Sequence, residues 1–148
     1  MKDLQACDNI PFLSSFPFSD DESFRERFKV PVVVSATANA ISVSIGEFIP
    51  VRNISAPAGT LSVKLIIAVA AAKLATGISS GWQTESIDIP FNNLEIPAKV
   101  VDFSVPTEAG TIIVAAAKLV YYGYKGNPIL AIEKKGFNPA GVIKAIYL

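Results

Sequence analysis

The sequence contains no histidine and a single cysteine, Cys7. Without histidine, the chain lacks the base of Ser-His-Asp and Cys-His nucleophile systems and the imidazole ligand of many zinc sites. One cysteine forms no disulfide within the chain, so cysteine usage does not indicate a redox compartment. Dinucleotide-binding, P-loop and EF-hand spacings are also missing from the sequence. We therefore expect no enzymatic activity and no cofactor or metal, and the cellular location stays unassigned.

The chain has no net charge, because 13 basic residues balance 13 acidic residues. Nucleic-acid-binding domains usually carry a basic excess or a basic stripe, and neither is visible here. The longest apolar run, residues 65–72, is far shorter than the ~20 residues that cross a bilayer as a helix. These features predict neither a nucleic-acid partner nor a membrane span. A neutral chain also meets little electrostatic repulsion when two copies approach each other.

The length of 148 residues corresponds to about one domain. Hydrophobic residues make up 51% of the chain, and isoleucine and valine clearly outnumber leucine. Because β-branched side chains lose rotamer freedom in helices and pack well on pleated sheets, this composition favours a mainly β protein.

Residues 1–22 differ from the rest of the chain. Two prolines disfavour a helix there, so we predict an extended N-terminal arm, followed by a β-sandwich domain over residues 23–148. The arm carries three phenylalanines that are candidate contacts with the chain's own domain or with a second copy: Phe12, Phe16 and Phe18. A third alternative is that the arm makes no contact.

Alternating apolar and polar residues predict most of the strands. Residues 24–30 alternate in this way, although the FRER sequence at 24–27 is also compatible with a short helix. Residues 32–45 predict two strands joined by a turn at 38–40, and residues 47–58 predict a connection. Further strands are expected within these segments: 81–90, 100–105, 129–133 and 142–147.

The hexapeptide VAAAKL occurs twice, at 69–74 and at 114–119, and each copy follows an Ala-Gly-Thr triplet. Alanine favours helices, but a helix over 64–74 would place its two lysines on opposite sides and leave no polar face. As strands, both segments have a continuous apolar face and β-favouring neighbours. We therefore predict two long strands that form a pseudo-symmetric pair. Chance repetition in an alanine-rich sequence remains an alternative, because the spacings of the repeated pieces disagree.

Eight or nine short-spaced strands with Pro and Gly turns predict an all-β sandwich or barrel. The segment Phe48–Thr60, FIPVRNISAPAGT, resembles a recurring segment of an uncharacterised bacterial protein family. The later turns at Asn127-Pro128 and 136–138 are similar as well. The resemblance implies an immunoglobulin-like β-sandwich in which Phe48–Thr60 joins two strands, and it implies no activity.

Aromatic residues are the best candidates for a ligand-binding surface. Trp82 follows a glycine, and Tyr122 and Tyr124 share one face of a predicted strand while Tyr121 takes the other. Flat exposed aromatic rings are common anchors for sugars and protein partners. The alternative is that Trp82 is the core tryptophan of the sandwich.

Two functions follow from these patterns. The first is a non-catalytic structural or assembly module that self-associates, or binds a protein partner, through the arm or a sheet edge. The second is a module that binds a carbohydrate or a peptide through Trp82, Tyr122 and Tyr124. Paired carboxylates of a hydrolase are a third hypothesis, but the acidic residues of the central region show no recurrent spacing: Glu85, Asp88, Glu95, Asp102 and Glu108.

Overall fold

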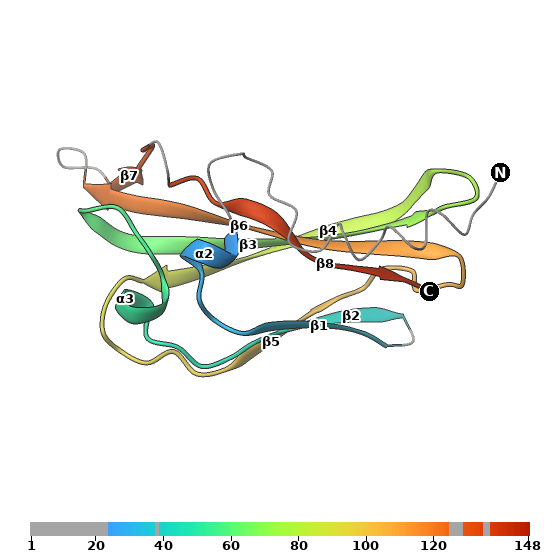
Figure 1. Cartoon of the computed structure of the whole chain (residues 1–148), viewed down its shortest axis with the longest axis horizontal. Helices are drawn as coiled ribbons and strands as arrows, with labels where there is room; N and C mark the ends of the chain where they lie inside the picture. The colour runs from blue at the N-terminus through green and yellow to red at the C-terminus, as the bar shows by residue number, and fades with distance from the viewer. Residues whose placement is uncertain (1–23, 38, 125–128, 135–136) are drawn as a thin grey trace.

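The computed structural model describes residues 24–148 apart from 38, 125–128 and 135–136, and these residues form two antiparallel sheets (Figure 1). The all-β prediction is therefore confirmed. The predicted arm at 1–22, with Phe12, Phe16 and Phe18, lies outside the described residues, and so does the turn at 127–128.

Eight strands and two one-turn helices make up the described part of the chain. The smaller sheet has the order β1-β2-β5 and consists of β1 (Val32–Thr37), β2 (Ala40–Ile45) and β5 (Lys99–Phe103). The larger sheet has the order β4-β3-β6, and both β7 and β8 pair with β6. Its strands are β3 (Thr60–Lys73), β4 (Ile78–Pro90), β6 (Thr111–Tyr124), β7 (Ile129–Ala131) and β8 (Ala140–Tyr147).

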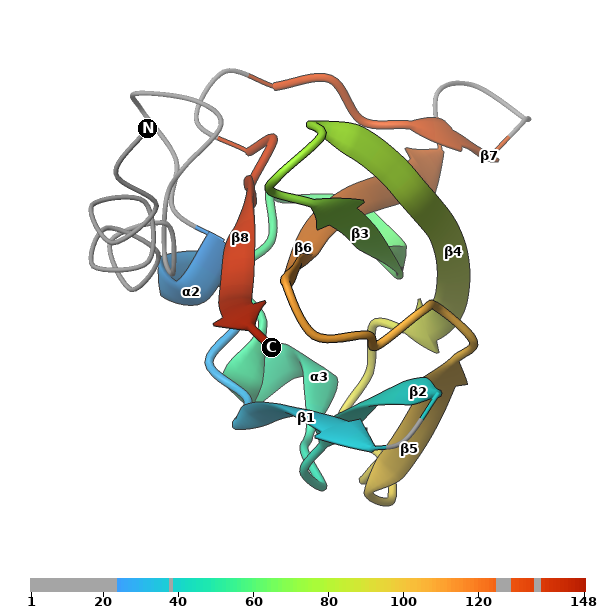
Figure 2. The same ribbon diagram turned by 90° about the vertical axis from the view of Figure 1, so that its right-hand side faces the viewer.

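The hydrophobic core lies between the two sheets, which form two layers in Figure 1. On β2, Ile41, Val43 and Ile45 are buried while the intervening serines are partly exposed, as the alternating sequence predicts. β3 and β6 bury every second residue in the same way. Figure 2 shows β4 curving away from the larger sheet toward β5. A hydrogen bond from the backbone N–H of Ser104 to the Gln83 side chain joins the two sheets there.

The repeated Ala-Gly-Thr triplets form equivalent turns. The N–H of Thr60 bonds to the carbonyl of Pro57, and the N–H of Thr111 bonds to the carbonyl of Glu108. Gly59 has a φ of 86° and Gly110 a φ of 80°, which is the left-handed geometry that a type II turn requires of its third residue. Each triplet therefore starts a long strand, β3 or β6.

The two VAAAKL copies lie on neighbouring strands at the centre of the larger sheet. Their pairing is antiparallel, so that Val69 lies opposite Ala115 and Ala70 lies opposite Val114. The prediction of two long strands is confirmed, and the copies meet in one sheet because β3 and β6 pair along almost their whole length.

The predicted strand at 24–30 is wrong in its first half, where the alternative of a short helix is confirmed as α2 (Phe24–Arg27). A strand would direct Glu26 toward the same side as Phe24 and Phe28. The helical turn instead brings Phe24 and Phe28, four residues apart, to one side. Both rings are buried and stack with centroids 5.3 Å apart, while Glu26 is exposed.

The connection predicted at 47–58 contains a second turn of helix, α3 (Pro50–Asn53). The Asn53 side chain accepts a hydrogen bond from the N–H of Ile49, at the start of the turn. Segment Phe48–Thr60 thus joins β2 to β3, as expected. Within the described residues, neither helix has the length and apolar composition needed to cross a membrane.

Tyr121 fastens this connection to the larger sheet. Its side chain points into the core with 1% exposure, and its hydroxyl donates a hydrogen bond of 2.8 Å to the carbonyl of Ser55. A partly buried carbonyl that loses its donor keeps part of its desolvation cost without compensation.

We predict that Tyr121→Phe lowers the free energy of unfolding by about 1 kcal/mol, because it removes this one partly buried hydrogen bond. Tyr124→Phe is the matched control, since Tyr124 is 66% exposed on the same strand, and it should leave stability unchanged. Denaturant unfolding of both variants is the measurement. Equal stability of Tyr121→Phe and the parent chain would contradict a structural role for the hydroxyl.

Candidate functional site

Trp82 lies on β4, on the outer face of the larger sheet. Its position in the ladder is opposite Ala70 on β3, and Ala70 lies opposite Val114 on β6. The indole is 70% exposed, so the alternative of a core tryptophan is wrong. Its neighbours across the sheet, Ala70 and Val114, have short apolar side chains that leave the ring uncovered.

The two predicted binding tyrosines lie near the end of β6, on the same outer face. Tyr122 is partly buried, and the ammonium of Lys64 lies 5.7 Å from the centre of its ring. Tyr124 is exposed, whereas Tyr121, the residue before Tyr122, points into the core. The predicted division of the tyrosines between two faces is therefore confirmed.

The structure does not bring Trp82 and the tyrosines together. On β3, Trp82 pairs with Ala70 and Tyr122 pairs with Ser62. These two positions are eight residues apart, which is about 26 Å along a strand. Trp82 and the tyrosines therefore do not form a single compact site.

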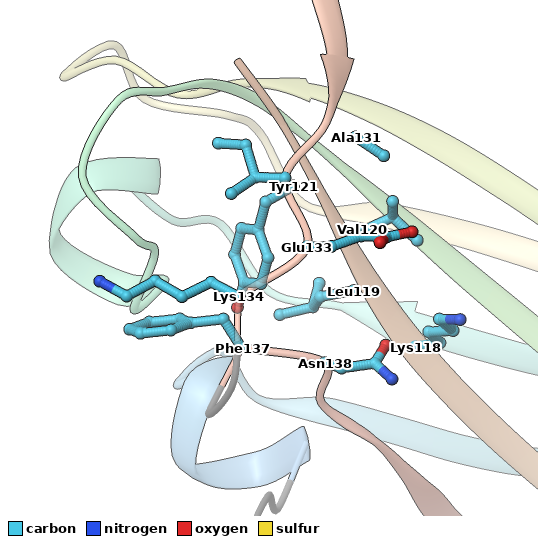
Figure 3. A pocket seen from close by; sticks show the side chains of 10 residues that line it. Lys118, Leu119, Val120, Tyr121, Ala131, Glu133, Lys134, Phe137 and Asn138 are labelled. Atoms are coloured by element: carbon cyan, nitrogen blue, oxygen red, sulfur yellow. The ribbon is translucent and has the colours of Figure 1, made fainter. Parts of the chain in front are cut away.

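A pocket of about 480 Å³ opens beside β6, where this strand changes partner from β8 to β7 (Figure 3). Between the two pairings, the N–H of Leu119 bonds to the carbonyl of Pro139 and the N–H of Ile132 bonds to the carbonyl of Tyr121. The described residues on either side of 135–136, which are 132–134 and 137–139, therefore depart from the edge of β6 and leave space beside it. The volume falls in the range of small-molecule pockets.

The lining of this pocket combines an aromatic corner with charges of both signs. Tyr121 and Phe137 meet edge to face with centroids 6.0 Å apart, and the guanidinium of Arg27 lies 4.4 Å from the centre of the Phe137 ring. Lys118 and Lys134 lie on opposite sides of the pocket in Figure 3, with the carboxylate of Glu133 between them. This arrangement has the character of a binding surface, and it contains no nucleophile beside a base.

Sequence reasoning missed this pocket. The Gly-Phe-Asn-Pro turn at 136–139 and the aromatic end of β6 were visible in the sequence as separate features. Nothing in the residue pattern indicates that β6 pairs with β8 over one half and with β7 over the other, and the pocket depends on that change.

The candidate carboxylates belong to different surroundings. Glu85 pairs with Ile67 and Asp88 pairs with Lys64, so these two acids belong to opposite faces of β4. Asp88 lies 3.7 Å from the Lys64 ammonium. Asp102 accepts a hydrogen bond from the Ser42 hydroxyl. In the described part of the chain, no three Asp, Glu, His or Cys side chains form a group that could hold a metal ion.

Lys73 and Glu108 form a shorter ion pair than Lys64 and Asp88, at 2.7 Å. Lys73 ends β3 and Glu108 precedes the turn into β6, so the pair joins the ends of the two central strands. Lys73 reaches water, as lysines at strand ends usually do. The hydrogen bond from Lys73 and the attraction of its charge lower the pKa of the Glu108 carboxyl. A depressed folded-state pKa means that any stabilisation is present above the ordinary carboxyl pKa and disappears as pH falls through the folded value.

We predict that Lys73→Gln raises the pKa of Glu108 toward its ordinary value, because the positive charge is lost and a neutral amide is a weaker hydrogen-bond donor to a carboxylate. Carboxyl chemical shifts followed by NMR during an acid titration measure this directly. Lys64→Gln is the control, since Lys64 pairs with Asp88 and should leave Glu108 unchanged. A Glu108 titration that is the same in Lys73→Gln as in the parent chain would show that the ion pair does not form in solution.

Comparison with known proteins identifies no relative: no protein-family model matches the chain, and no curated protein matches its sequence.

Proposed function

We propose that this chain is a non-catalytic structural or assembly module with an immunoglobulin-like β-sandwich. The distribution of its strands supports the fold. Named in chain order as A, B, C, C′, E, F and G, the strands β1 to β6 and β8 form one sheet A-B-E and a second sheet C′-C-F-G. That distribution, with all neighbours antiparallel, is typical of immunoglobulin-like sandwiches. The short strand β7 is an addition beside the end of β6.

The observation that carries the assembly function is the edge of the smaller sheet at β1. The chain from Val30 to Gly46, which includes all of β1 and β2, contains no charged residue. On β1, Val33 is 61% exposed, and the residues from Ser35 to Thr37 are exposed as well. An uncharged open edge with exposed apolar side chains is the kind of strand to which other chains add.

A second candidate function, binding of a carbohydrate or a peptide, is favoured by the exposure of Trp82. An aromatic ring that is 70% exposed on the outer face of the sheet is available for stacking against a ligand. The 26 Å separation described above limits such a site to the surroundings of Trp82. Tyr122 and Tyr124 would form a separate contact.

We predict that the full chain self-associates in a concentration-dependent manner, because neither net charge nor edge charge opposes contact between copies. Light scattering over a dilution series gives the mass. The triple variant Phe12→Ser/Phe16→Ser/Phe18→Ser should self-associate equally if the sheet edge makes the contact. If the parent chain and the triple variant are both monomers at every concentration, the assembly function is wrong. If only the triple variant is a monomer, the arm makes the contact.

We predict that the fluorescence of the chain has the emission maximum of a water-exposed indole, because Trp82 is the single tryptophan. A glycan or peptide that stacks on the ring will shift this emission to shorter wavelength, and Trp82→Phe will weaken its binding. Tyr124→Phe is the control for the distant aromatic contact. A panel of glycans and extended peptides that leaves the emission unchanged would contradict the second function.

A further inference from the structure

We propose that the partner of the β1 edge is a second copy of this chain, and that the two β1 strands pair antiparallel about a two-fold axis at Val34. This inference rests on the proposed assembly function and specifies its interface. It joins the smaller sheets of two copies into one continuous sheet, in which the strand order is β5-β2-β1 followed by β1-β2-β5 of the second copy.

The backbone of β1 presents unused hydrogen-bonding groups in a regular row. The N–H of Gly46 bonds to the carbonyl of Pro31, so these two residues form a hydrogen-bonded pair of the ladder. Every second pair along the ladder is of the same kind: Val33 with Ser44, Ser35 with Ser42, and Thr37 with Ala40. Because hydrogen-bonded and non-hydrogen-bonded pairs alternate in an antiparallel ladder, the backbone groups of the intervening residues point away from β2. These residues are Val32, Val34 and Ala36, and among the described residues β1 pairs only with β2.

This row is symmetric about its middle residue. If Val34 lies opposite Val34 of the second copy, then Val32 lies opposite Ala36 of the second copy, and Ala36 opposite its Val32. All three residues on each strand then satisfy both backbone groups with the other strand. Pro31 does not interfere, because it belongs to the series that faces β2.

The side chains of β1 fit the same arrangement. Val32 and Val34 point inward and are partly buried against the core, so the pairing does not need to move them. Val33 and Ser35 lie on the outer face, where each would meet the other residue type across the axis. A cross-strand pair of a β-branched residue and a serine carries no charge to desolvate.

The other sheet edges carry features that oppose such pairing. β4 curves strongly, has a register shift beside Ala72, and bears the exposed carboxylates of Glu85 and Asp88. β5 has Lys99 and Asp102, and β8 has Lys144 and a register shift of its own. β7 is exposed and uncharged, but it has only three residues, and a very short edge strand offers few backbone groups for pairing. Charges, bulges and curvature are the usual devices that protect an edge strand from addition. β1 has six residues without any of them.

Pairing of one short strand per copy buries little surface, so the expected dimer belongs to the weak, concentration-dependent class. Introduced charge tests the register directly. In Val33→Lys/Ser35→Lys, the lysine introduced at position 33 of each copy meets the lysine introduced at position 35 of the other, and like charges directly opposite each other destabilise a strand pair. Both positions are exposed, so the domain itself should keep its fold and its unfolding midpoint.

The experiment compares the masses of four full-length samples by light scattering over a dilution series: the parent chain, Val33→Lys/Ser35→Lys, Val33→Glu/Ser35→Glu, and an equimolar mixture of the two variants. The expected result is a dimer for the parent, a monomer for each variant alone, and a heterodimer for the mixture. The control Thr84→Lys/Ser86→Lys places the same charges on exposed positions of β4 and should leave the parent dimer unchanged.

The outcomes separate this interface from the wider assembly function. If the parent self-associates and the β1 variants do so equally, the β1 interface is wrong while the assembly function stands. If the β4 control removes the dimer and the β1 variants keep it, the contact belongs to β4. If the parent remains a monomer at every concentration, both proposals fail. Loss of the dimer in each β1 variant and its restoration in the mixture would support the antiparallel register about Val34.

Discussion

The antiparallel pairing of β3 with β6 is the constraint on which the rest of the structure depends. Each strand has 14 residues, and the two remain paired from the Thr60 end of β3 to its Lys73 end. Their alternate side chains form one wall of the core, and their outer edges provide the places for β4, β7 and β8. A central pair that long explains why both strands begin at the same kind of glycine turn, since any slip of one residue would turn the whole apolar row toward water.

Close approach of the chain at the ends of this pair limits which residues fit there. Gly123 lies in a run of strand-forming residues, where glycine is otherwise unfavourable. A Cβ at this position would collide with the carbonyl oxygen of Gly59 and with the Ile132 side chain. The turn before β3 therefore packs directly on the backbone of β6, and Tyr121 completes the contact through its bond to Ser55. The pocket lies near this end of β6, where the strand changes partner from β8 to β7.

The properties that suggest function lie at the periphery of this rigid centre. The core uses the apolar alternation of β2, β3 and β6, whereas the exposed residues that support the two proposed functions, Val33 and Trp82, lie on the edge strands β1 and β4. The sheets of an open sandwich end in edge strands, and each edge strand is either protected or available for contact. β4 carries charge and a bulge, and β1 carries neither, so the two edges differ in what they permit.

Sequence patterns by themselves determined the all-β class, the positions of most strands, and the faces of Tyr121 and Tyr122. These features depend on residues two to four positions apart, and local periodicity records them. Only the tertiary structure decided that 24–27 form a helix, that Trp82 is exposed, that Trp82 lies about 26 Å from Tyr122, and that a pocket opens beside β6. Those results depend on which strands become neighbours, and pairing between distant segments is set by the packing of the whole core rather than by any local pattern.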